Sequence, residues 1–170
     1  MPVPATPEYA TAVAAVAELL TRLRLDFIFL GNVARAVWLG GEASSGSIDV
    51  LALMSPEQKN SVAMMASNRG FRVDREEIEQ SEELDLVPLK FDDIRVHVLV
   101  ASNALYGRMV AAGVVHDSIK VPAREDFALL LAMSGDEINL HSLTLQPEFD
   151  RARYNETLVS IGLAELAIAQ

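Results

Sequence analysis

One strand-like segment of the chain carries a carboxylate in apolar surroundings. The segment GSIDVLAL, residues 46–53, places Asp49 between Ile48 and Val50, with Ser47 two positions before it. Side chains at positions i and i+2 of a strand lie on the same face, so we expect Ser47 and Asp49 to lie side by side. Two acids at these positions would hold a metal ion, whereas a serine and an acid form a weaker ligand pair.

Two other features could contribute to the same chemistry. His97 lies between Val96 and Val98, and as a metal ligand it would need further partners, of which only Asp49 is an obvious candidate; the alternative is a structural or solvent-facing histidine. Gly31 and Asn32 follow an apolar run and precede a helix-like segment. Such a turn either delivers backbone N–H groups to an anion or simply joins a strand to a helix.

Composition limits the class of protein and of partner. The chain has 170 residues, which suits one compact domain, and 51% of them are hydrophobic. Its formal charge of -10, without a run of Lys or Arg, argues against nucleic acid as a partner. It has no cysteine, no apolar run long enough to cross a bilayer and no secretory signal pattern, so we expect a cytoplasmic protein without a membrane partner.

The elements that would position these residues alternate between helix and strand. Residues 7–24, 33–39, 55–69 and 103–112 have helical spacing or capping signals, and most of residues 124–170 is expected to be helical with breaks near Gly135 and Pro147. Strands are expected at residues 27–30, around Asp49, at 71–73 and at 118–121, and residues 84–90 and 94–100 form a predicted hairpin. The acidic stretch at residues 74–85 is predicted to be solvated.

This alternation predicts the class α/β (α+β), with a mixed β-sheet flanked by helices. Residues 1–121 are expected to form the main domain. Residues 122–170 would be a helical C-terminal extension packed on it, so that the chain is a single compact unit.

The segment FLGNVARAVWLGGEASSGSIDVLAL, residues 29–53, resembles the core of the polymerase-beta-like nucleotidyltransferase fold. The resemblance is strongest to AbiEii-like nucleotidyltransferases of bacterial toxin–antitoxin systems. It continues in RVHVLVASNALYGRMV and in VPAREDFALLLA, so that it covers roughly residues 10–135. Members of that family carry Gly-Gly or Gly-Ser after the first strand and Asp-x-Asp on the second.

The resemblance implies roles for particular residues. Ser47, Asp49 and His97 occupy the three positions at which the family places carboxylates, and Leu131 occupies that of a lysine. Gly31 and Asn32 occupy the loop that faces the nucleotide phosphates. A hydroxyl and an imidazole cannot offset the charge of two Mg²⁺ ions, so Asp49 would remain as a remnant of the metal site.

Three hypotheses follow from this pattern. The first is a non-catalytic nucleotide- or protein-binding module. The second is an active, toxin-type nucleotidyltransferase that holds Mg²⁺ with Asp49 and an unconventional acid such as Glu42, Asp92 or Asp93. The third is a homodimer or larger scaffold, in which Met64, Met65, Met109 and the apolar tail LAELAIA would supply the surface.

Overall fold

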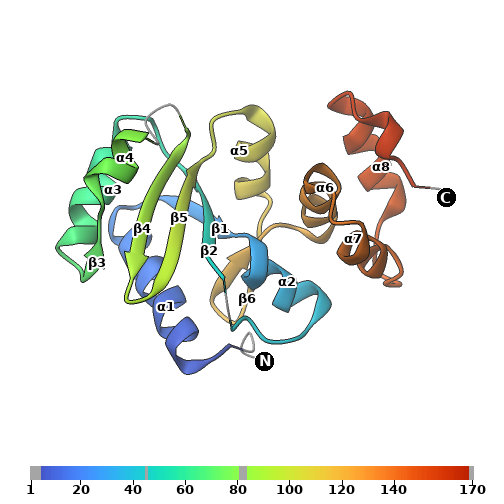
Figure 1. The fold of residues 1–170 in the computed structure, drawn as a ribbon. Coiled ribbons are helices and arrows are strands. Elements are labelled where there is room, and N and C mark those ends of the chain that lie inside the picture. The colour runs from blue at the N-terminus through green and yellow to red at the C-terminus, as the bar shows by residue number, and fades with distance from the viewer. Residues whose placement is uncertain (1–4, 45, 81–83, 169–170) are drawn as a thin grey trace.

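The chain folds into a mixed sheet with helices on both faces and a group of helices at one side (Figure 1). The computed structural model describes residues 5–44, 46–80 and 84–168. The strands are β1 (Asp26–Phe29), β2 (Ile48–Leu53), β3 (Phe71–Arg72), β4 (Leu86–Phe91), β5 (Ile94–Val100), β6 (Val114–His116) and β7 (Ile119–Val121). The helices are α1 (Pro7–Arg22), α2 (Gly31–Leu39), α3 (Gln58–Ser67), α4 (Arg75–Gln80), α5 (Ala104–Ala111), α6 (Arg124–Ser134), α7 (Glu137–Thr144), α8 (Arg151–Ser160) and the short 3₁₀ helix η1 (Ala164–Leu166).

The main sheet has the strand order β1-β2-β5-β4-β3. Strand β2 pairs with β1 in antiparallel and with β5 in parallel orientation, and β4 and β5 form the predicted antiparallel hairpin. Strands β6 and β7 form a separate two-stranded sheet. The predicted class, a mixed sheet flanked by helices, is therefore confirmed.

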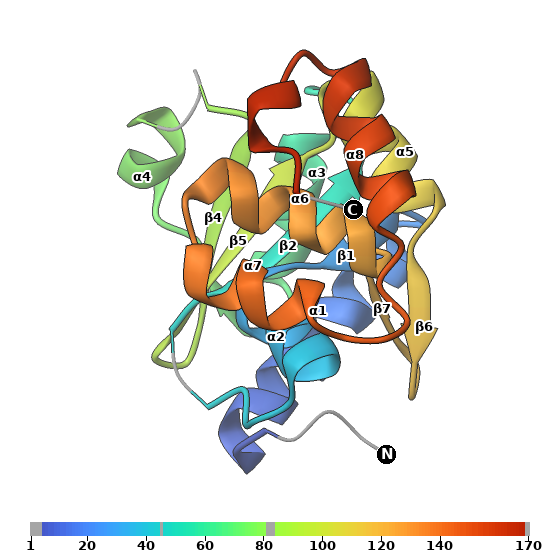
Figure 2. The same ribbon diagram turned by 90° about the vertical axis from the view of Figure 1, so that its right-hand side faces the viewer.

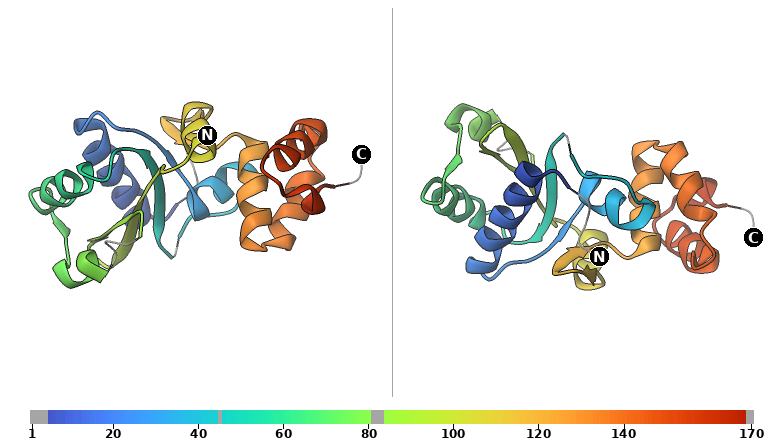
Figure 3. Two further views of the ribbon diagram at one scale, coloured as in Figure 1. Left: turned by 90° about the horizontal axis from the view of Figure 1, so that it is seen from above. Right: turned by 90° about the horizontal axis from the view of Figure 1, so that it is seen from below.

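The two faces of the main sheet are covered differently. Ile48, Val50 and Ala52 of β2 are fully buried, and they alternate with Asp49, Leu51 and Leu53 on the opposite face. Figure 3 shows α1 and α3 on one side of the sheet and the C-terminal helices on the other. Figure 2 looks across α6 and α7 onto β2, β4 and β5. The face that carries Asp49 thus points toward the C-terminal helices.

Several predicted boundaries need correction. Helix α2 begins at Gly31, two residues before the predicted start, and α3 begins at Gln58 and not at Ser55. Helix α1 ends at Arg22, because Arg24 adopts a positive φ of 56°. The strand predicted at residues 27–30 is β1 (Asp26–Phe29), which begins one residue earlier, ends at Phe29 and lies at the edge of the sheet.

Strand β6 was missed by the sequence analysis. Ser118, predicted to open a single strand, instead forms with Asp117 the turn between β6 and β7, where the φ values of Asp117 and Ser118 are 46° and 72°. Two positive φ angles in a two-residue turn suit a β-hairpin, but Asp-Ser is not the Asn-Gly or Asp-Gly pair that signals one in a sequence. The helical C-terminus agrees with the prediction, with breaks at Gly135 and around Pro147.

The division into residues 1–121 and 122–170 stays a prediction. Part of the acidic stretch that was predicted to be solvated forms α4, and residues 81–83 of that stretch lie outside the described residues. No helix in the described ranges is both long and apolar enough to span a bilayer.

Candidate functional site

Asp49 and His97 are direct neighbours on the face of the sheet that points toward the C-terminal helices, which we call the open face. The parallel register of β2 and β5 pairs these two residues, and His97 Nδ1 lies 2.8 Å from Asp49 Oδ1. Their side chains are 29% and 35% exposed. The hydrogen bond to Asp49 raises the pKa of the His97 imidazole, although partial burial of the ring opposes that shift. The contact with Asp49 therefore stabilises the protonated form of the imidazole relative to an isolated histidine.

Ser47 completes the surroundings of the Asp49 carboxylate. Its Oγ lies 3.0 Å from Oδ1 and 3.1 Å from Oδ2 of Asp49, so that the hydroxyl donates to the carboxylate. The predicted placement of Ser47 and Asp49 on one face is thus observed. Both acceptor oxygens of Asp49 lie within reach of side-chain donors of the chain itself.

Gly31 lies against the other side of the Asp49 carboxylate. Its φ is +51°, and a Cβ at this position would lie 2.8 Å from Asp49 Oδ2. The backbone holds the two segments together, because Leu30 N–H donates to the Asp49 carbonyl oxygen at 2.8 Å. Only glycine tolerates both the backbone conformation and the close approach without displacing the carboxylate.

The Asn32 side chain lies beside Tyr9 and the loop before β2. A Cβ on Gly46 would lie 2.8 Å from Asn32 Nδ2, and the Asn32 side chain hydrogen-bonds to Tyr9. Binding of a phosphate by Gly31 and Asn32 stays a prediction.

Tyr9 is a contributor to the site that the sequence analysis did not single out. Its hydroxyl donates to the Ser47 carbonyl oxygen at 2.9 Å, which anchors helix α1 to the start of β2. Burial, reinforced by the charge of Asp49, raises the pKa of Tyr9 to about 12. The available signal was spacing: Tyr9 precedes Val13, Val16 and Leu20 on the apolar face of α1.

The Asp49–His97 pair opens into a cleft between the sheet and α6. The cavity has a volume of about 370 Å³. Beside Gly31, Asp49 and His97, its lining is almost entirely apolar and comprises Leu30, Leu86, Leu99, Phe127, Leu130 and Leu131, with Ser134 at one end. Leu131, at the position where the resemblance implies a lysine, does line this cleft. No lysine or arginine belongs to the described lining.

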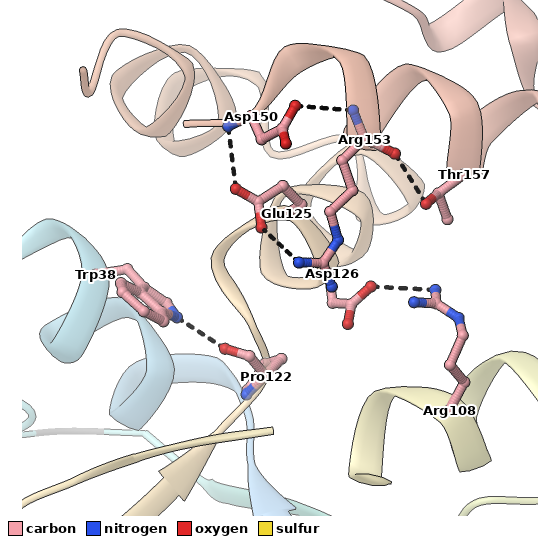
Figure 4. A network of polar contacts seen from close by, with 8 residues as sticks. All are labelled: Trp38, Arg108, Pro122, Glu125, Asp126, Asp150, Arg153 and Thr157. Atoms are coloured by element: carbon pink, nitrogen blue, oxygen red, sulfur yellow. Dashed lines mark hydrogen bonds and ion pairs between the residues drawn. The ribbon is translucent and has the colours of Figure 1, made fainter. Parts of the chain in front are cut away.

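The wall of the cleft formed by α6 is held in place by polar contacts (Figure 4). Asp126, with a side chain only 3% exposed, pairs with Arg108 of α5 at 3.1 Å. Trp38 of α2 donates from Nε1 to the Pro122 carbonyl oxygen at 3.0 Å, just before α6 begins. These contacts fix the start of α6 to α5 and α2, and so they position Phe127 and Leu130 opposite the sheet.

The described residues offer few metal ligands around Asp49. Within the described ranges, no group of three or more His, Asp or Glu side chains is placed to hold a metal ion. The unconventional acids proposed from the sequence, Glu42, Asp92 and Asp93, therefore form no such group with Asp49 and His97. Met109, predicted to supply an oligomer surface, is fully buried, so that expectation is wrong for this residue, whereas Met64 is 67% exposed.

Comparison with known proteins gave matches at the level of structure only. Scans against protein-family models and against curated proteins gave no match. The chain is similar to the solution structure of the antibiotic-resistance factor ANT(2'')-Ia, with a TM-score of 0.54 and 12% sequence identity. The aligned region covers 92% of this chain and 88% of ANT(2'')-Ia. A crystal structure of ANT(2'')-Ia in complex with adenylyl-2''-tobramycin gives a TM-score of 0.51 at 15% identity, with 92% and 91% of the two chains covered.

A structure described as a tRNA-processing enzyme aligns with a TM-score of 0.45 and 15% identity over 93% of this chain and 49% of the other. ANT(2'')-Ia is an aminoglycoside nucleotidyltransferase. Its likeness to this chain extends over nearly the whole of both chains. The chain accordingly has a nucleotidyltransferase-like fold.

Proposed function

We propose that this protein is a non-catalytic binding module built on the nucleotidyltransferase fold. The observation that carries the proposal is the state of the Asp49 carboxylate. It is hydrogen-bonded by Ser47 and by His97, and no second acid joins them among the described residues. The carboxylate is satisfied by the chain itself, through a hydroxyl and an imidazole.

The donor set at this position is a poor fit to the metal that nucleotidyl transfer uses. Mg²⁺ demands octahedral coordination by hard oxygen ligands, and two such ions need several carboxylates. One carboxylate, one hydroxyl and one imidazole supply a single negative charge. A divalent ion would also have to displace the His97 imidazole from Asp49, against a charge-assisted hydrogen bond of 2.8 Å.

The residues that line the cleft also argue against a nucleoside triphosphate as its ligand. A nucleoside triphosphate carries several negative charges, and binding sites for it place cationic side chains or metal ions at the phosphates. The described lining of this cleft contains one acid, one histidine and otherwise mainly leucine and phenylalanine. It is better suited to the apolar groups of a ligand or a partner protein than to a polyphosphate.

Calorimetry tests the proposal. ATP, CTP, GTP and UTP are titrated separately into the purified chain, with and without Mg²⁺. We expect no Mg²⁺-dependent binding of any of the four. Tight binding that requires Mg²⁺, and that is lost in Asp49→Asn, would overturn the proposal and support a metal-dependent enzyme.

A further inference from the structure

The cleft beside Asp49 and His97 is the middle section of a longer trough over the open face of the sheet. On one side it continues into a cavity of about 480 Å³, with which it shares Leu30, Leu86, Leu99 and Leu130. On the other side it adjoins a cavity of about 540 Å³, with which it shares Leu86 and His97. Cavities of this size accommodate small molecules.

One end of the trough is apolar. The cavity of about 480 Å³ is lined chiefly by Leu30, Leu51, Leu84, Leu86, Leu99 and Leu130, together with Tyr106 of α5. Its polar lining residues are Asp85 and Ser102. An apolar group that enters this end leaves water and gains roughly 25 cal/mol for each Å² of its buried surface.

The opposite end of the trough is polar and carries cationic side chains. It is lined by Lys90 of β4 and Arg95 of β5, with Glu77 and Gln80 of α4 beside them. Lys90 has an existing partner in Asp93, but that contact is long at 3.9 Å and Asp93 is 99% exposed. Lys90, Arg95 and Glu77 leave one excess positive charge at this end, in a chain whose net charge is -10. His97, which also belongs to this lining, is paired with the Asp49 carboxylate.

The trough therefore changes in character along its length, from a leucine-lined end to an end with one excess positive charge. We propose that it binds an amphipathic small molecule with an elongated apolar body and a single carboxylate. The body lies over Leu86, Leu99 and Leu130, and the carboxylate meets Arg95 and Lys90. This inference rests on the proposed binding function of the same cleft and names its ligand class.

A carboxylate fits the charged end better than a polyphosphate does. A single negative charge matches the excess charge of that end, whereas a triphosphate would bring uncompensated charges against Glu77 and Asp49. The planar guanidinium of Arg95 can also hold both oxygens of one carboxylate.

Decanoate is the probe for this inference, titrated calorimetrically into the full chain below its micelle concentration. Acetate carries the same carboxylate without the apolar body, and decyltrimethylammonium carries a comparable body with a cation. We expect decanoate to bind, acetate to give no measurable binding, and the cationic amphiphile to bind at least about tenfold more weakly.

Variants locate the two ends of the ligand. Arg95→Gln removes an exposed cation and is expected to weaken decanoate binding by about tenfold, because a charge-assisted hydrogen bond is lost. Leu99→Asn, confirmed as folded by circular dichroism, is expected to weaken it by a similar factor. Arg22→Gln is the matched control, because Arg22 is a comparably exposed cation on α1, beyond the other face of the sheet.

Failure of decanoate to bind the folded chain would overturn the inference, and so would equal binding by Arg95→Gln and the wild type. The nucleotide titrations separate this failure from a failure of the proposed function. Mg²⁺-dependent binding of ATP would overturn both proposals. If neither ATP nor decanoate binds, only the inference about the ligand is overturned.

Discussion

Substitution of Gly31 by alanine is the sharpest test of how the Asp49 carboxylate is placed. The new Cβ would lie 2.8 Å from Asp49 Oδ2, which is closer than real Cβ contacts come. Either the helix start or the Asp49 side chain must move, and a displaced carboxylate weakens its hydrogen bonds to Ser47 and His97. The site should therefore lose stability beyond the cost of the backbone conformation alone.

Gly70→Ala provides a matched control for that backbone cost. Gly70 also has a positive φ, of +84°, but nothing lies within 4 Å of a Cβ built there. An alanine in the left-handed region costs about 1–2 kcal/mol at either position. Loss of hydrogen bonds to a charged group adds about 1–2 kcal/mol at Gly31, after allowance for the partial exposure of the pair.

The assay is urea unfolding, followed by circular dichroism, for both variants and for the same changes in an Asp49→Ala background. We expect Gly31→Ala to lower the free energy of unfolding by about 1–2 kcal/mol more than Gly70→Ala does. That extra loss should disappear when Asp49 is alanine, because the obstacle is gone. Equal losses for Gly31→Ala and Gly70→Ala, or an extra loss that persists without Asp49, would refute this account of the site.

Three further predictions follow from the same structure. The hydrogen bond to Asp49 raises the pKa of His97, so the stability that the protonated imidazole contributes is fully present below the unfolded pKa of about 6.5 and is lost as the pH rises through the folded pKa. The difference in unfolding free energy between the wild type and His97→Gln should therefore shrink from pH 5 to pH 9. A difference that stays constant over this range would contradict the prediction. Arg108→Met leaves the Asp126 carboxylate buried without its partner and should destabilise the chain by about 3 kcal/mol, whereas Arg108→Met combined with Asp126→Leu should unfold in urea close to the wild type. Tyr9→Phe removes the donor to the Ser47 carbonyl and should cost about 1 kcal/mol, and ultraviolet titration should find one tyrosine fewer that resists ionisation at pH 11.

The pairing of Asp49 with His97 shows what could be predicted from the sequence. Each residue was recognisable as a polar side chain in an apolar strand, and the resemblance placed both in one site. The parallel register that sets them side by side is a tertiary property, because the two residues are 48 positions apart in the sequence. The two-residue spacing of Ser47 and Asp49 nevertheless predicted that these two side chains lie on one face of the strand.

The features that were not predicted depend on contacts between distant segments. The role of Tyr9 needs α1 to pack under the start of β2, and the orientation of Asn32 needs the loop at Gly46 to close over it. Strand β6 was missed because its turn, Asp117-Ser118, lacks the usual hairpin residues. The apolar lining of the cleft likewise combines strands and α6, which no local pattern brings together.

Metal affinity tests the central claim, that His97 and Ser47 satisfy the Asp49 carboxylate in place of a divalent ion. Mn²⁺, a spectroscopic substitute for Mg²⁺, is titrated into the wild type and into the folded double variant Ser47→Asp/His97→Asp, with free Mn²⁺ followed by electron paramagnetic resonance. The account predicts that the double variant binds Mn²⁺ at least about tenfold more tightly than the wild type does. Binding by the wild type as tight as that of the double variant would contradict it.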